Sequence, residues 1–239
     1  MRKLLDHLAD LWTKQINPRV SSFIAFFSIV WLAVCILATY VLAELSDEVL
    51  EREAFAIDRH ILLFIHQFTS PALDAVFVGI TSLGDPRTVV PLTVFIFCFL
   101  WLKRYRTEAK VLALDAAGGA VLSYFLKLAF SKERPQLWDS AINEITFSYP
   151  SGHALGSMVL YGFLSYVFAS IYPRYAKAFY AVAALLITAI GLSRLYLGVH
   201  WPTDIVAGYC IGFLWISICI TLLRLRKVKK ERELERNSA

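Results

Sequence analysis

Long runs of residues without charge constrain this chain more than any other feature of its sequence. The first, residues 20–43, exceeds the roughly 20 apolar residues that a helix needs to cross a bilayer. Further candidates lie at 88–102, 111–130 (apolar apart from Asp115 and Lys127), 154–171, 178–193 and 205–223. With 58% hydrophobic residues, the chain has far more apolar surface than a soluble bundle of this length could bury. We therefore predict an all-α fold, a polytopic membrane helical bundle with about six transmembrane helices.

Basic residues orient these predicted spans. Lys and Arg gather before the first run, between the second and third, between the fourth and fifth, and after the sixth. With six spans these four segments lie on one side, which the positive-inside rule makes cytoplasmic. We expect a multi-pass protein of the cell membrane with both termini in the cytoplasm. The short chain, without glycosylation sequons, favours a bacterial inner membrane. Topology and anionic lipids account for the basic tail, so no nucleic-acid partner is expected.

The same reasoning predicts the organisation of the chain. A cytoplasmic amphipathic segment (1–19) precedes the membrane domain (20–223), and a basic cytoplasmic tail (224–239) follows it. The outer loop (44–87) is expected to carry an interfacial helix. Apolar residues recur at helical spacing outside the spans at Leu4, Leu5, Leu8, Leu11 and Trp12, and at Phe55, Ile61, Leu62, Ile65 and Phe68. Such stripes are typical of helices lying on a membrane surface.

Polar residues that hydropathy does not explain gather at the outer ends of the spans. Lys127 lies near the end of the third run, and Arg134 follows seven residues later beside Pro135. On a helix these two cations would share a face, whereas a break near Pro135 would let Arg134 fold back across the span end. Snorkelling of Lys127 to the interface, or a loop position for Arg134, would explain either residue alone.

The stretch Pro150-Ser151-Gly152-His153 stands where the fourth apolar run begins. Small residues let backbone N–H groups approach a ligand, and the N-terminus of a helix attracts anions. His153 would stand at that positive end. Taken alone, the stretch would also suit an interfacial loop with an unpartnered histidine.

A third polar group joins the fifth and sixth runs. Arg194 ends the fifth, while His200 and Asp204 lie four residues apart where the sixth begins. Asp204 could accept the proton of one ring nitrogen of His200, which fixes the tautomer and leaves the other nitrogen free to attack. A capping aspartate beside an interfacial histidine is the simpler explanation.

The three groups together indicate phosphate chemistry. Cations and a helix N-terminus suit a phosphate, an oriented histidine suits a nucleophile, and a second histidine can protonate a leaving oxygen. No set of carboxylates and histidines suggests a metal site, and we expect no cofactor.

The three groups resemble the signature of the type 2 phosphatidic acid phosphatases, which are integral-membrane lipid phosphate phosphatases. The signature reads K-x6-R-P, P-S-G-H and S-R-x5-H-x3-D. The matching residues are Lys127, Arg134 and Pro135, then Pro150, Ser151, Gly152 and His153, then Ser193, Arg194, His200 and Asp204. The segment Thr81-Ser82-Leu83-Gly84-Asp85 resembles a further family segment weakly.

This resemblance implies roles for individual residues and a site at the extracytoplasmic face. His200 would attack phosphorus to give a phosphohistidine, Asp204 would orient His200, and His153 would protonate the leaving group and then activate water. The phosphate oxygens would be bound by Lys127, Arg134, Arg194, Ser151 and the backbone of Gly152.

The resemblance also implies metal-independent hydrolysis of a lipid phosphate or diphosphate such as phosphatidylglycerol phosphate, phosphatidic acid or undecaprenyl diphosphate. No obligate protein partner is expected beyond the lipid substrate and the membrane lipids. Two alternatives stay open. One is different chemistry on the same scaffold, as a lipid-to-lipid phosphotransferase or a vanadate-dependent oxidase. The other is a non-enzymatic lipid or anion transporter, although transporters usually carry polar residues through the bilayer depth.

Gly208 and Gly212 form a G-x-x-x-G motif in the sixth run. Glycines at this spacing let two helices approach closely. We expect them to pack against another helix of the same chain rather than against a second copy.

Overall fold

A computed structural model of the protein describes residues 18–50, 56–142 and 144–238. This described part is helical and contains no strand. Its elements are α2 (Pro18–Leu50), α3 (Ala56–His66), α4 (Pro71–Ser82), α5 (Pro86–Leu102), α6 (Arg106–Phe130), α7 (Gly152–Ser157), the π-helical turn η1 (Met158–Gly162), α8 (Phe163–Ile171), the 3-10 turn η2 (Pro173–Tyr175), α9 (Ala176–Tyr196) and α10 (Pro202–Ser238).

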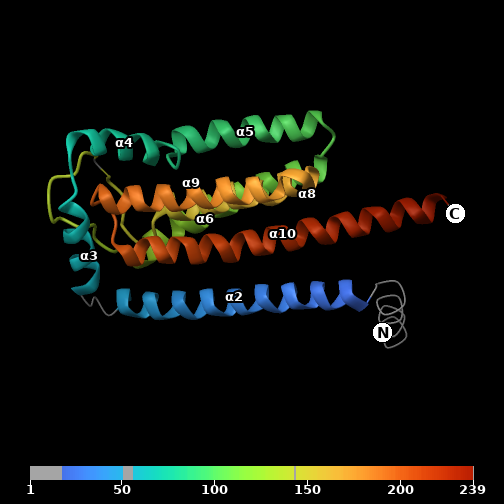
Figure 1. Cartoon of the computed structure of the whole chain (residues 1–239), viewed down its shortest axis with the longest axis horizontal. Coiled ribbons are helices and arrows are strands. Elements are labelled where there is room, and N and C mark those ends of the chain that lie inside the picture. The colour runs from blue at the N-terminus through green and yellow to red at the C-terminus, as the bar shows by residue number, and fades with distance from the viewer. Residues whose placement is uncertain (1–17, 51–55, 143, 239) are drawn as a thin grey trace.

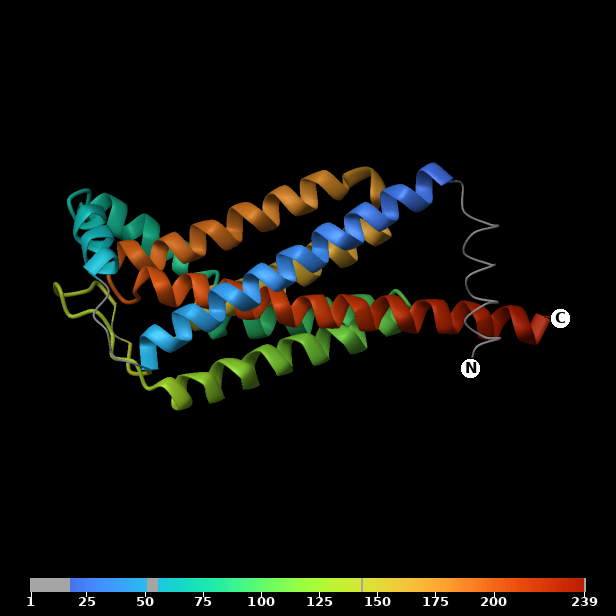
Figure 2. The same ribbon diagram turned by 90° about the horizontal axis from the view of Figure 1, so that it is seen from below.

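The long helices lie side by side along one axis (Figures 1 and 2). Five helical segments of the described chain are long and apolar enough to cross a membrane, and the bent pair α4–α5 makes a sixth. The prediction of an all-α membrane bundle with about six spans is confirmed. The start of α2 and the end of α10 lie at one end of the bundle, whereas α3 and the loop between α6 and α7 lie at the other (Figure 1).

The segment expected to be an outer loop contains more helix than predicted. α2 continues to Leu50, and α4 forms where no helix was expected. The hydroxyl of Ser70 accepts from the backbone N–H of Leu73, with Pro71 in the first turn of α4, and Asp85 caps α5 in the same way. α4 and α5 meet at a bend of 40° and together are long and apolar enough for one broken span, which would begin before residue 88.

The two amphipathic stripes have different outcomes. A separate short helix, α3, lies between the first two spans at one end of the bundle and carries Ile61, Leu62 and Ile65 of the second stripe. Phe55 of this stripe lies outside the described residues, and the place of α3 on the membrane surface stays a prediction. The N-terminal stripe lies in residues 1–17, outside the described residues. The basic tail is the continuation of α10 to Ser238. Lys227 near the start of this tail pairs with Glu108 of α6, with Nζ and Oε1 2.8 Å apart.

The two glycines of the G-x-x-x-G motif bring α10 against α7. A Cβ atom on Gly208 would lie 2.8 Å from the carbonyl oxygen of Ser151, and one on Gly212 would lie 3.0 Å from that of Leu155. Such contacts are too close for any side chain, so glycine is required. The predicted packing within one chain is confirmed, and it places the start of α7 beside the start of α10.

Candidate active site

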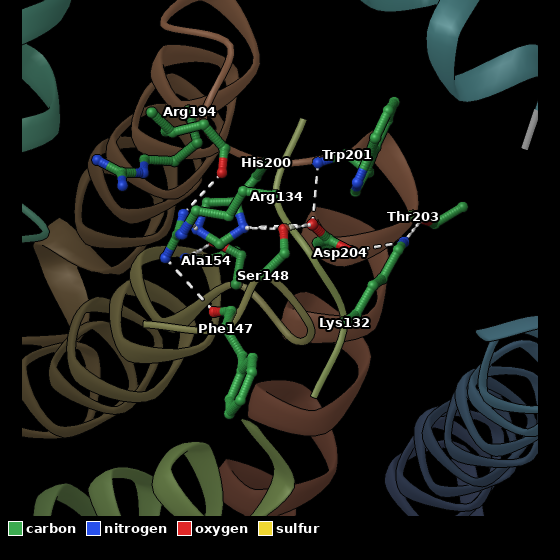
Figure 3. Close-up of polar contacts among 12 residues, drawn as sticks. Lys132, Arg134, Phe147, Ser148, Ala154, Arg194, His200, Trp201, Thr203 and Asp204 are labelled. Atoms are coloured by element: carbon green, nitrogen blue, oxygen red, sulfur yellow. Dashed lines mark hydrogen bonds and ion pairs between the residues drawn. The ribbon is translucent and has the colours of Figure 1, made fainter. Parts of the chain in front are cut away.

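The three polar groups meet at the end of the bundle that carries α3. α6 ends at Phe130, and Ser131 then takes a left-handed backbone conformation with φ 47°. Lys127 therefore stays on the last turn of α6, while Arg134 lies in the loop and folds back towards the start of α10 (Figure 3). The alternative in which both cations share a helical face is wrong because the helix stops four residues before Arg134.

His200 and Asp204 form a buried pair. Nδ1 of His200 lies 3.3 Å from Oδ2 of Asp204, and the two side chains are 1% and 0% exposed. Asp204 also accepts from the backbone N–H of Trp201 at 2.9 Å. Because the carboxylate faces Nδ1, it favours the tautomer with its proton there, and Nε2 keeps a free lone pair. Burial lowers the pKa of His200 well below its usual value, although Asp204 opposes this, so the ring is neutral at pH 7.

Two side chains that the sequence analysis missed support this pair. Nζ of Lys132 lies 2.9 Å from Oδ1 of Asp204, and the hydroxyl of Ser148 donates to Oδ2 of the same carboxylate (Figure 3). Lys132 also donates to the hydroxyl of Thr203 at 3.1 Å, and that hydroxyl donates to Asp58 of α3 at 2.6 Å. The short helix α3 thereby helps to hold the start of α10.

Two arginines bind the carboxylate of Glu144 beside His200. Arg194 is 1% exposed and pairs with Glu144 through NH2, while its NH1 donates to the hydroxyl of Thr81 at 2.8 Å. NH2 of Arg134 lies 3.6 Å from the other oxygen of Glu144. NH1 of Arg134 lies 3.1 Å from Nε2 of His200. The two guanidinium groups thus form an anion-binding site next to the ring nitrogen that keeps its lone pair.

The remaining predicted phosphate ligands lie nearby. Lys127 donates from Nζ to the carbonyl of Phe147. A Cβ atom on Gly152 would lie 3.6 Å from Cε of Lys127, so the start of α7 adjoins this cation. The hydroxyl of Ser151 accepts from the backbone N–H of Ala154 at 3.4 Å and so caps the helix. Contact of Ser151 and Gly152 with phosphate stays a prediction.

His153 packs against the junction of α4 and α5. A Cβ atom on Gly84 would lie 2.9 Å from Cδ2 of His153, so only a glycine fits there. The weakly matching segment at residues 81–85 thus supplies both Thr81 under Arg194 and Gly84 against His153.

A pocket of about 540 Å³ opens beside these groups. Its polar lining includes Lys127, Arg134 and Glu144, and its apolar wall includes Tyr124 and Leu128 of α6. Both wall residues are exposed on the flank of the bundle. A ligand with an anionic head and an apolar tail would match both parts. Within the described residues, no group of three or more His, Cys, Asp or Glu side chains could hold a metal ion, and metal independence stays a prediction.

Fold and site together define an integral-membrane protein with an anion-binding centre and an oriented histidine at one end of a helical bundle. The model of the PAP2 superfamily matches residues 108–227, and the chain belongs to this superfamily. The match includes every residue of the predicted site.

Relatives and solved structures agree with this assignment. Phosphatidylglycerophosphatase B of Bacillus subtilis is 31% identical over 60% of this chain and 72% of its own length. An undecaprenyl-diphosphatase of Sulfolobus acidocaldarius is 29% identical over 61% of this chain and 68% of its own length. The crystal structure of a transmembrane PAP2-type phosphatidylglycerolphosphate phosphatase from Bacillus subtilis superposes with a TM-score of 0.71 at 25% identity, covering 80% of this chain and 94% of that one. The crystal structure of Aquifex aeolicus LpxE superposes with a TM-score of 0.58 at 27% identity, covering 71% of this chain and 98% of that one.

Proposed function

We propose that the protein hydrolyses a lipid phosphate or diphosphate at the extracytoplasmic membrane face through a phosphohistidine on His200. Membership of the superfamily and the named phosphatases among its relatives support a phosphoric monoester hydrolase that acts on lipid phosphates. The observation that carries the mechanism is the geometry of His200. Its Nδ1 faces Asp204, and its Nε2 lies next to a guanidinium of the anion-binding site.

The chemistry follows from these positions. Lys127, Arg134 and Arg194 would neutralise the phosphoryl oxygens, which removes the repulsion that keeps a nucleophile away from phosphorus. Nε2 of His200 would form a bond to phosphorus as the bond between phosphorus and the lipid oxygen breaks. The proton on Nδ1 would stay on the ring, hydrogen-bonded to Asp204. The departing oxygen would take a proton from His153. Water would then attack the phosphohistidine and give its proton to His153, which releases inorganic phosphate and restores both histidines.

The pocket supports a lipid substrate, since apolar side chains of α6 flank its polar part. Candidate lipids are phosphatidylglycerol phosphate, phosphatidic acid and undecaprenyl diphosphate. The test is phosphate release by pure protein in detergent from a panel of lipid phosphates at matched surface concentration. Release from at least one lipid is expected. If free phosphate appears from none of them, a transporter would be the better hypothesis, and if phosphate moves to an added acceptor lipid, a phosphotransferase would be.

Activity is expected to survive removal of divalent metal. Three cationic side chains supply the positive charge that a metal ion provides in other phosphatases. Phosphate release in excess EDTA should stay within about twofold of the untreated rate, while orthovanadate should inhibit by imitating five-coordinate phosphorus. Loss of activity in EDTA that added divalent ion restores would contradict the mechanism.

The site is expected to open to the extracytoplasmic side, as the distribution of Lys and Arg indicates. A cysteine at Gln136, which is exposed and lines the pocket, should react with an impermeant thiol reagent outside intact cells once the native cysteines are replaced. The matched control is a cysteine at Lys103, exposed in the turn between α5 and α6 at the other end of the bundle. It should react only after permeabilisation, and the reverse pattern would invert the topology.

A further inference from the structure

The groups expected to bind phosphate are already occupied by the chain itself. The carboxylate of Glu144 accepts from Arg194 through one oxygen and lies 3.6 Å from Arg134 through the other. A carboxylate presents two anionic oxygens to guanidinium groups in the same manner as a phosphate does. Glu144 therefore stands where the phosphoryl oxygens of the substrate would lie.

The attacking nitrogen is also engaged. With the Nδ1 proton directed to Asp204, Nε2 of His200 is an acceptor, and NH1 of Arg134 lies 3.1 Å from it. The same NH1 donates to the carbonyl of Val199 at 2.6 Å. A lone pair that accepts a hydrogen bond from a guanidinium cannot at the same time attack phosphorus. Without substrate, the side chain of Glu144 thus occupies the anion site, and the guanidinium of Arg134 occupies the lone pair of the nucleophile.

The position of Glu144 suits a group that can leave. It lies in the loop between α6 and α7, its side chain is 24% exposed, and the next residue, Ile145, is fully exposed. Arg194 is buried and needs an anionic partner, because a buried charge without one is unfavourable. Thr81 supplies only a neutral hydroxyl to it. In the absence of substrate Glu144 fills that need, and a phosphate dianion could fill it equally well.

We propose that Glu144 is a tethered competing anion that closes the resting site, yields to the substrate phosphate and then returns to displace the product phosphate. This inference rests on the proposed function, since the arginines must be the site of the substrate phosphate. Two anions on the same guanidinium groups repel each other, so substrate entry requires Glu144 to leave. As Arg134 turns to the phosphate, its NH1 leaves Nε2 of His200, so binding frees the nucleophile.

The test replaces the competing charge while keeping the shape of the side chain. In the full-length protein in detergent, Glu144→Gln should bind inorganic phosphate and orthovanadate at least about tenfold more tightly than the wild type, the size expected when one charge-assisted pair no longer competes. Equilibrium dialysis with labelled phosphate measures this directly, and inhibition of nitrophenyl phosphate hydrolysis measures it independently. The KM for lipid phosphate should fall as well.

The matched control is Glu133→Gln. Glu133 lines the same pocket and is exposed, and within the described part of the chain it forms no ion pair with an arginine. Its replacement removes the same charge and should change phosphate affinity by less than about twofold. Glu144→Asp keeps the charge but shortens the reach, so its phosphate affinity should lie between those of the wild type and Glu144→Gln.

The outcomes separate this inference from the proposed function. If Glu144→Gln hydrolyses lipid phosphate but binds phosphate no better than the wild type, Glu144 merely positions the arginines and the inference is wrong. If neither protein binds phosphate nor hydrolyses a lipid phosphate, the proposed function fails and the inference fails with it. Folding of each variant is checked by thermal unfolding, in which added phosphate should raise the Tm of Glu144→Gln more than that of the wild type.

Discussion

Replacing His200 with alanine is expected to abolish hydrolysis of lipid phosphate and of nitrophenyl phosphate alike. The alanine variant has no nitrogen to attack phosphorus, whichever group leaves. Burial lowers the pKa of His200, so in the wild type the ring is neutral at pH 7. Its Nε2 lone pair can then attack once Arg134 has turned to the substrate phosphate. Loss of a nucleophile that acts as part of a unit costs about 10⁴-fold or more in kcat.

The measurement is a single-turnover rate with each substrate in detergent. His60→Ala is the matched control, because His60 is exposed on α3 and should leave the rate within about twofold. Asp204→Asn should cause a smaller but still large loss, since an amide can direct its N–H at Nδ1 and favour the wrong tautomer. A rate for His200→Ala above about 1% of the wild-type rate would contradict nucleophilic attack by this residue.

Most of the fold could be predicted from the sequence because membrane spans are defined by local composition. Long apolar runs predicted α2, α6, the segment that begins with α7, α9 and α10. α4 was missed because Asp74 interrupts its apolar run and the Gly84-Asp85 pair separates it from the run of α5. Its helix depends on the Ser70 cap and on packing with α9, with Phe77 stacked on Tyr196 at 4.0 Å between ring centroids. Such tertiary contacts produce no periodic pattern in the local sequence, so the sequence could not predict this helix.

The candidate site was predictable for a different reason. Its signature residues lie at the ends of spans, where their spacing survives in the sequence. Lys132, Ser148 and Glu144 were missed because they lie in the loop between α6 and α7. Lys132 and Ser148 contact Asp204, and Glu144 contacts Arg194, each across 50 or more residues of the chain. The spacing of residues along the sequence does not indicate contacts between segments so far apart. The one available signal was the position of Lys132 inside the K-x6-R-P block, whose intervening residues the signature leaves free.

Replacing His153 with alanine is expected to separate the two chemical steps that replacing His200 removes together. A proton donor matters most when the leaving group is poor, as a lipid alcohol is. Hydrolysis of lipid phosphate should therefore fall by about 10²- to 10⁴-fold. Nitrophenolate leaves without a proton, so the first step should still occur with nitrophenyl phosphate. The second step should stall, because water attacking the phosphohistidine has lost its base.

The expected record for His153→Ala is a burst of nitrophenolate close to one equivalent per protein, followed by a slow steady rate. With radiolabelled substrate, phosphate should be trapped on this variant as an acid-labile, base-stable adduct, while none should be trapped on His200→Ala. Ser157→Ala, a buried change one turn further along the same helical segment, controls for damage to the start of α7 and should give no burst. If the label appears on His200→Ala instead, the roles of the two histidines are reversed. If His153→Ala turns over nitrophenyl phosphate without a burst, His153 does not activate the water.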